Sequence, residues 1–411
     1  MTGLFADWRY GILLVLVFSL PVLLGDVGTV LIMIMAALVA VSAVPRFCSH
    51  HRPVPLPVWL FTCSFVLMAI ALIASAREAT DARFVLNFAP LLLAAPLAVA
   101  EANERPQASL NHIAILSAIG AALSLAIACV QVFVFAEARA GEHVINAIHF
   151  ANIALTLGFM ALVGIFTSAS KWRYLLLLGP ICAIVSCVLS ASRGPLVGAL
   201  VLFAIFFAIL WFRSRRSTLL ILGAGLIVGA VLFAAASAFA PTQLGRLSNA
   251  AAVIMETLME GETGDRSTNI RLGLFAGGWA AFQDSIWIGH GWDRIIAASH
   301  PYLEPWLQDF LDARNFTYLH NDVLDFAAGA GILGVLAYLL MMVAPTIGVI
   351  VGPRDDLFLG RLYGALVLTV GFFVFGLTSR LMGHALQLTL FCMMSMVINS
   401  YGRRGAAGHA P

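Results

Sequence analysis

The sequence predicts an all-α integral membrane protein with about twelve transmembrane helices and one long outer loop. Three observations support this fold class. Hydrophobic residues make up 61% of the 411 residues and charged residues only 11%, whereas a soluble globular protein carries about 25% charged residues. Apolar runs long enough to cross a bilayer recur along the whole chain. They leave one long polar segment, at about 241–321, which is not low-complexity and indicates a loop rather than a separate soluble domain.

Charge and cysteine usage narrow the function. The net charge of +2 provides no basic surface suited to nucleic acid. The apolar runs make the lipid bilayer the expected partner. The six cysteines form no CxxC pair and none lies in the long polar segment, so they predict neither a disulfide framework nor a metal site. The apolar run from Ile12 follows Arg9 without a small-residue cleavage pattern, and we expect it to remain as an uncleaved first span.

The predicted spans are apolar runs separated by short polar or turn-forming segments. The Gly25-Asp26 turn separates the first two, and Pro90 and Pro96 predict a kink in the fourth. We place the spans at about 10–24, 27–44, 57–75, 84–100, 112–136, 146–167, 174–190, 195–212, 218–240, 322–351, 358–377 and 381–399.

The distribution of lysine and arginine predicts the orientation of these spans. With a cytoplasmic N-terminus, thirteen such residues fall in inner segments and five in short outer loops, so both termini are expected in the cytoplasm. The chain then divides into helices one to nine (1–240), the long outer loop (241–321), and helices ten to twelve with a cytoplasmic tail (322–411). The five arginines of the short outer loops are Arg77, Arg83, Arg139, Arg193 and Arg380.

Two amphipathic helices are predicted within the long loop. Ser267 or Thr268 is suited to cap the first helix. After this cap, an arginine and three aromatic residues follow one another at spacings of four, four and three, which places all four on one helix face. We expect both helices to lie on the outer, membrane-facing rim. The face of the first carries Arg271, Phe275, Trp279 and Phe282, and that of the second carries Leu303, Trp306, Leu307, Phe310 and Leu311.

Two outer arginines are candidates for binding an anion. Arg193 lies in the tight turn Ser192-Arg193-Gly194-Pro195, where Pro195 suits the first position of a helix. A guanidinium beside a helix N-terminus forms an anion site. Together with Arg271, it is able to offset the roughly two negative charges of a lipid-linked diphosphate without a divalent metal. Alternatively, Arg193 only extends from a helix end to the membrane surface. For Arg271 the alternative is a position on a solvated helix face.

His320 is the candidate general base because it lies where a predicted helix begins. The positive end of a helix dipole disfavours imidazolium, and a neutral imidazole is able to accept a proton. The alternative is a capping or interfacial histidine without chemistry. Asn321 is a candidate for orienting His320. Asp322 and Asp325 share one helix face, but two carboxylates alone are a weak indication of a metal site, and we predict none.

The glycine-rich turn Gly289-His290-Gly291-Trp292 lies in a segment enriched in aromatic residues. His290, Trp292 and Tyr318 are therefore candidate contacts for sugars. The alternatives are a structural turn that leaves His290 exposed and an aromatic belt at the membrane interface.

These motifs together resemble the O-antigen ligase and polymerase superfamily. The run from His320 to Leu324, with two glycines after it, is similar to the signature of that family, and 284–291 is similar to its Pro-x-x-Gly-x-Gly turn. Arg193 and Arg271 match its arginines after the seventh or eighth span and in the loop. The resemblance covers the architecture of the whole chain, with sharp motifs at about 192–195, 268–292 and 318–334. The chain departs from the family at Gly329, where a glutamate is often found, and at Ser285, which replaces a proline.

The resemblance implies a membrane glycosyltransferase of the GT-C-like class in the inner membrane of a Gram-negative bacterium. Its donor would be O-antigen polysaccharide on undecaprenyl diphosphate, and its acceptor a sugar hydroxyl of the lipid A-core oligosaccharide in the periplasm. It would use no metal or nucleotide, with His320 as base and Arg193 and Arg271 on the diphosphate. The alternatives are an O-antigen polymerase, a secondary transporter for an anion, and a structural scaffold. The transporter is disfavoured because the three residues gather at one membrane face rather than at mid-membrane.

Overall fold

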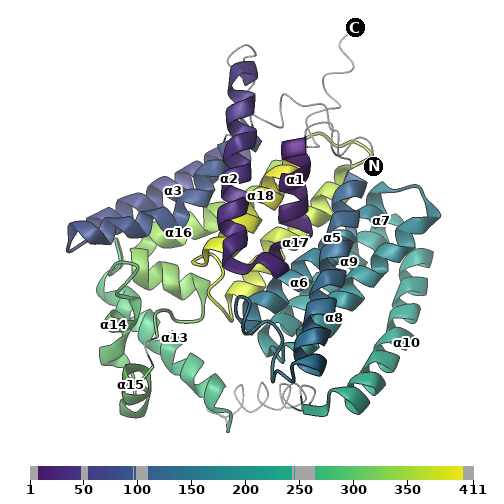
Figure 1. The fold of residues 1–411 in the computed structure, drawn as a ribbon. Coiled ribbons are helices and arrows are strands. Elements are labelled where there is room, and N and C mark those ends of the chain that lie inside the picture. The colour runs from purple at the N-terminus through teal and green to yellow at the C-terminus, as the bar shows by residue number, and fades with distance from the viewer. Residues whose placement is uncertain are drawn as a thin grey trace.

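The computed structural model describes residues 8–47, 54–95, 97–98, 110–242, 245, 264–314 and 316–400. The expected cytoplasmic tail, part of the fourth predicted span and most of the loop between residues 243 and 263 lie outside the described residues. Across the described ranges, all regular structure is helical, as the sequence predicts. Figure 1 shows these helices packed as one bundle.

The bounds of the helices follow the predicted spans over most of the chain. From the N-terminus, they are α1 (Trp8–Phe18), α2 (Pro21–Phe47), α3 (Leu56–Ala74), η1 (Ala79–Leu93), α5 (Leu110–Cys129), η2 (Val130–Val134), α6 (Ala147–Ala161), α7 (Val163–Thr167), η3 (Lys171–Leu177), α8 (Leu178–Leu189), α9 (Arg193–Arg213), α10 (Arg215–Phe239), α13 (Arg266–Asp284), α14 (Ile295–Ser299), η4 (His300–Tyr302), α15 (Pro305–Asp312), α16 (Asp322–Ile350), α17 (Phe358–Gly376) and α18 (Ala385–Ser400).

Nine helices in the described part of the chain are long and apolar enough to cross a membrane, rather than the twelve expected. The helices α1 and α18 are apolar but shorter. The fourth predicted span differs in kind, because its described part is mainly the 3₁₀ helix η1, with Pro90 buried inside it. Proline removes a backbone N–H and clashes with the carbonyl four residues earlier, so the tighter i to i+3 pattern replaces the expected kinked α-helix.

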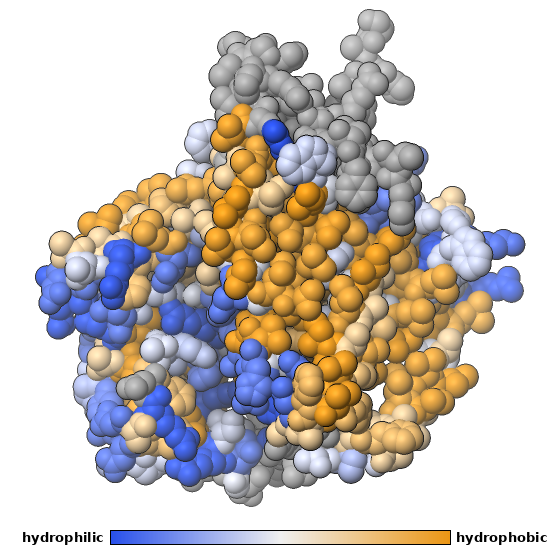
Figure 2. Space-filling view, in the orientation of Figure 1, coloured by the Kyte–Doolittle hydropathy of each residue, from blue (hydrophilic) through white to orange (hydrophobic). Residues whose placement is uncertain are grey.

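The bundle is built around α6, whose membrane-spanning stretch, continued by α7, is 94% buried. Helices α5 and α8 pack on α6, while α16 packs along α3 and α17. By contrast, none of the residues in the apolar stretch of α10 is buried, and Figure 1 shows this helix at the edge of the bundle. Figure 2 shows apolar residues covering the side of the bundle over α1, α2, α5 and α8, as expected for a surface in contact with lipid.

The two amphipathic helices predicted in the long loop are present as α13 and α15, but α13 packs through a different face. Its buried residues are small or aliphatic, whereas Trp279 is 53% exposed. Gly277 and Gly278 allow Leu303 and Leu319 to pack directly against the α13 backbone. Leu307 of α15 packs in the same way against Gly273, and Figure 2 shows polar residues gathered over α13–α15.

The predicted orientation of the spans is tested with reporter fusions. A reporter active only outside the cytoplasm is expected to be active when fused after Asp265 and silent when fused after Arg215. The physical reason is the excess of positive charge in the predicted inner loops. The reverse pattern would place the candidate residues of the outer face in the cytoplasm.

Candidate active site

A pocket of about 250 Å³ brings together three arginines from separate segments, Arg139, Arg193 and Arg271. Arg193 and Arg271 were the predicted anion-binding pair. Arg139 lies between η2 and α6, and sequence reasoning did not single it out. The other lining residues are Ile148, Ala191, Ser192, Gly194, Pro195, Asp265, Ser267, Thr268 and Thr378.

The turn between α8 and α9 is held in place from the neighbouring segment. Arg139 Nε donates to Ser190 O at 3.0 Å, and its Nη2 donates to Ser192 Oγ at 3.2 Å. Ala191 between them has a φ of 50°, which closes a tight turn. Arg193 then begins α9, so its guanidinium and the N-terminus of a membrane-length helix meet at one place.

A second helix N-terminus points at the same pocket. Asp265 caps α13 by accepting hydrogen bonds from Thr268 N at 3.1 Å and Thr268 Oγ1 at 2.7 Å. Its other carboxylate oxygen lies 3.3 Å from Arg193 Nη1. Arg271 follows one turn later. Burial lowers the pKa of Arg271, the charge of Asp265 raises it, and the charges of Arg139 and Arg193 lower it further. An arginine stays protonated despite such a shift. Among the described residues that line the pocket, three guanidinium groups therefore accompany one carboxylate, an arrangement that suits an anion.

His320 lies beside this pocket in an unusual backbone conformation. Its φ of 60° is in the left-handed region, which costs a residue with a side chain about 1–3 kcal/mol, and such strained residues cluster at functional sites. Its ring centroid lies 4.5 Å from that of Tyr318 and 5.9 Å from that of Phe316. Burial, together with the charge of Arg271, lowers the pKa of His320 to about 4. The imidazole is therefore neutral at physiological pH, as a general base must be.

The residues on either side of His320 form hydrogen bonds to α16 and to the C-terminal end of α17. Leu319 N donates to Asp325 Oδ1 at 2.8 Å. Asn321 caps α16 by accepting from Leu324 N at 3.2 Å, and it donates to Leu377 O at 3.3 Å. Asn321 therefore fixes the backbone next to His320, whereas its predicted role was to orient the side chain.

The two carboxylates of α16 also bind backbone amides. Asp322 accepts from Leu381 N at 2.9 Å and from Met382 N at 3.1 Å, and Asp325 accepts from Leu319. Both are buried side chains that join α16 to neighbouring turns. Among the residues that the structure describes, no group of three or more histidine, cysteine or acidic side chains is arranged to hold a metal ion.

The glycine-rich turn is a structural element that fills a break in α16. Gly331 has a φ of 62° and interrupts that helix. The freed backbone groups bind the turn: His290 N donates to Ala328 O at 2.9 Å and Gly291 N to Gly329 O at 2.9 Å. The His290 ring lies with Nε2 2.7 Å from Ala281 O, so it faces α13 rather than the arginine pocket.

The two departures from the family pattern have local explanations. Ser285 Oγ donates to Gly289 O at 2.9 Å and so closes the turn in which a proline was expected. A Cβ at Gly329 would lie 3.1 Å from side-chain atoms of both Trp292 and Ile295, so tight packing fills this position. Trp292 itself is only 3% exposed and packs edge-on against Phe326, which leaves little of its ring for a sugar.

The structure thus brings Arg193 and Arg271 into one pocket and places Tyr318 against His320, near Arg271. It does not bring His290 or Trp292 into the pocket. Two arginines of the predicted outer loops were counted but not selected by sequence reasoning: Arg139 lines the pocket, and Arg380 donates to Thr317 O in the segment before His320. Their predicted outer position, against the positive-inside trend, was the available signal.

Comparison with known proteins agrees with this geometry. Residues 178–339 match the family model described as O-antigen ligase. The match runs from α8 into α16 and contains Arg193, Arg271 and His320. No curated protein matches the chain. Members of this superfamily are glycosyltransferase-like enzymes of O-antigen processing. The resemblance seen in the sequence is therefore confirmed over residues 178–339, which match the O-antigen ligase and polymerase superfamily.

Proposed function

We propose that this protein is an O-antigen ligase of the bacterial inner membrane. It would move O-antigen polysaccharide from undecaprenyl diphosphate to the lipid A-core oligosaccharide on the periplasmic face, without a metal ion. One observation carries the proposal: three arginines and two helix N-termini converge on a pocket beside a neutral histidine. That arrangement suits a group transfer in which a diphosphate leaves and a hydroxyl proton is removed.

In the proposed reaction, the diphosphate of the donor occupies the arginine pocket and displaces Asp265 from Arg193. His320 takes the proton of the acceptor hydroxyl as its oxygen bonds to the anomeric carbon. The bond from that carbon to the diphosphate oxygen breaks, and its electron pair leaves with the diphosphate. One direct displacement inverts the anomeric centre. The arginines stabilise the charge that develops on the leaving group, so no general acid is required.

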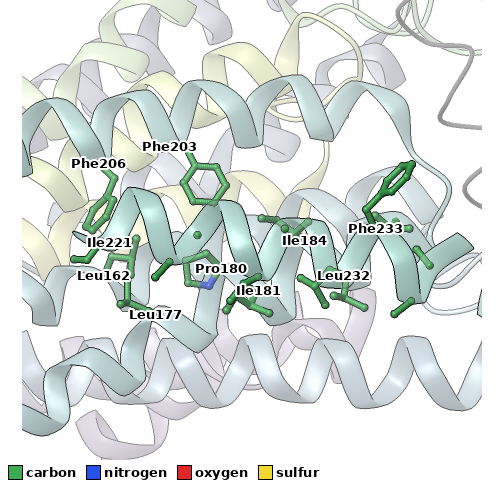
Figure 3. Close-up of a pocket in the computed structure, with 18 of the residues that line it drawn as sticks. Leu162, Leu177, Pro180, Ile181, Ile184, Phe203, Phe206, Ile221, Leu232 and Phe233 are labelled. Carbon is green, nitrogen blue, oxygen red and sulfur yellow. The ribbon is translucent and has the colours of Figure 1, made fainter. Parts of the chain in front are cut away.

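An apolar groove beside the pocket supports a polyprenyl-linked donor. The groove has a volume of about 780 Å³ and lies between α8 and α9 on one side and α10 on the other. Figure 3 shows phenylalanines of α9 facing aliphatic residues of α8 and α10 across it. The groove includes Leu189, two residues before Ala191 of the arginine pocket. Leu189 O accepts from Ala140 N at 3.0 Å, next to Arg139, so an apolar tail in the groove ends beside the three arginines.

A pair of glycines on α10 tests the groove. Gly225 lines it and Gly223 does not, and an added Cβ meets no atom within 4 Å at either position. Gly225→Trp is expected to raise KM for the lipid-linked donor about tenfold or more, because the indole occupies volume needed by the tail. Gly223→Trp is the matched control with unchanged kinetics. Equal kinetics for both variants in steady-state assays would contradict the placement of the tail.

The absence of a metal requirement is a separate prediction. Activity in vitro is expected to survive a chelator without added divalent cations, since the arginines supply the positive charge that the diphosphate needs. The measurement compares turnover with and without chelator in the same detergent. A strict requirement for magnesium or manganese would contradict the arginine account and redirect attention to Asp322 and Asp325.

The experiment that tests the proposed function uses purified protein with undecaprenyl-diphosphate glycan and core lipopolysaccharide. Glycan attached to the core supports the ligase. A lengthened undecaprenyl-linked chain identifies a polymerase instead, which is the nearest alternative within the superfamily. Transport of an anion without product formation would contradict both.

A further inference from the structure

The backbone of His320 needs support from outside its own segment. Its left-handed conformation persists only where surrounding structure holds it. The Nδ1 atom of His320 is buried and forms no hydrogen bond with any residue that the structure describes. In this part of the chain the ring is held by packing against Tyr318 and Phe316 and by the fixed backbone on either side.

Arg380, in the turn between α17 and α18, contacts the segment that carries His320. Its Nη1 donates to Thr317 O at 3.4 Å. Its guanidinium carbon lies 5.5 Å from the ring centroid of Tyr318 and 4.5 Å from that of Trp292. Trp292 is anchored in the core, edge-on to Phe88 and Phe326. Arg380 thus joins a fixed indole to the ring that packs against His320.

We propose that Arg380 is a positioning residue, which stacks between Trp292 and Tyr318 and so holds the His320 ring at the arginine pocket. The inference rests on the proposed function, in which His320 is the base. A guanidinium suits this role because it is planar, stacks on aromatic rings and still donates a hydrogen bond. Lysine keeps the charge but cannot stack in the same way.

On His320, Arg380 acts through geometry rather than through its charge. The charge that lowers the pKa of His320 is that of Arg271, whereas the charge of Arg380 acts on Tyr318, where it opposes the rise in pKa caused by burial. Loss of Arg380 should therefore change the placement of the imidazole and leave its protonation almost unaltered. This distinguishes Arg380 from Arg271, whose loss alters both donor binding and the pKa of His320.

The experiment compares Arg380→Lys and Arg380→Gln with Arg314→Gln. Arg314 is the matched control, since it also stacks on an aromatic ring, 4.2 Å from the Phe310 centroid, but lies exposed at the end of α15. Both Arg380 variants are expected to lose about 10²-fold in kcat, the scale of a misplaced catalytic group. Their KM for the lipid-linked donor and the acid-side midpoint of kcat/KM should stay as in the wild type. A wild-type kcat in both variants would overturn the proposal. A wild-type kcat in Arg380→Lys alone would also overturn it, because lysine keeps the charge but does not stack in the same way.

A second readout does not depend on activity. Diethylpyrocarbonate modifies accessible histidines, and mass spectrometry measures the rate at which it modifies His320 in the folded protein. This rate should change in the Arg380 variants and not in Arg314→Gln. If Arg380→Gln does not fold, Tyr318→Leu removes the ring on which Arg380 stacks and should change the same rate. Unchanged modification in all these variants would overturn the inference. A wild-type protein that transfers no glycan, with the modification rates altered as expected, would instead contradict the proposed function.

Discussion

Replacement of Arg271 by lysine is expected to lower kcat/KM for the lipid-linked donor by about 10²–10³-fold, which corresponds to roughly 2–4 kcal/mol of lost transition-state stabilisation. Burial already lowers the pKa of Arg271. A guanidinium makes two parallel hydrogen bonds to phosphate oxygens, whereas an ammonium acts as a point charge. Arg193→Lys should lose somewhat less, because its side chain is 32% exposed and partly screened by solvent.

Steady-state kinetics over a range of donor concentrations provide the measurement. Arg266→Lys is the control, because Arg266 begins the same helix, stacks 4.8 Å from the Phe310 ring and does not line the pocket. Near-native turnover by both Arg193→Lys and Arg271→Lys would mean that these side chains interact with lipid headgroups or solvent rather than with a diphosphate.

The sequence was sufficient for properties that depend on composition and local pattern. Long apolar runs predicted the helical fold class, and the spans predicted from about 195 and 322 correspond to α9 and α16, which begin at Arg193 and Asp322. The count of spans was less predictable, because a short apolar helix such as α1 and the 3₁₀ helix η1 have the hydropathy of spans without their length or geometry.

The convergence of three arginines was not predictable from local pattern. Arg139 precedes α6 by several residues and reaches the pocket only because its side chain binds the carbonyl of Ser190 across the bundle. The buried face of α13 was not predictable for a related reason. Spacing placed Arg271 and three aromatic residues on one face, but the face that packs inside the protein is the glycine face, which Leu303 and Leu319 approach closely.

Replacement of His320 by asparagine is expected to lower turnover by about 10²–10⁴-fold while donor binding and folding stay close to the wild type. Asparagine tolerates the left-handed conformation better than most residues, so the φ of 60° at this position is retained. His320→Ala should behave similarly, because alanine and histidine both carry a Cβ and pay a comparable cost for that conformation. If His320 only caps or packs, asparagine or glutamine should support normal activity.

The pH profile gives the same hypothesis a second test. The base acts as neutral imidazole, so activity is present above the pKa of His320 and is lost as pH falls through it. Burial and the charge of Arg271 lower that pKa to about 4 in the free enzyme, well below the usual value of about 6.5. The acid limb of kcat/KM should therefore have its midpoint near pH 4. A bound diphosphate adds negative charge and favours imidazolium, so the midpoint in kcat should lie higher than that in kcat/KM.

Arg271→Gln should raise the midpoint in kcat/KM, because it removes a positive charge near the ring. An acid limb that stays unchanged in His320→Asn would assign the titration to another group and remove His320 from the mechanism.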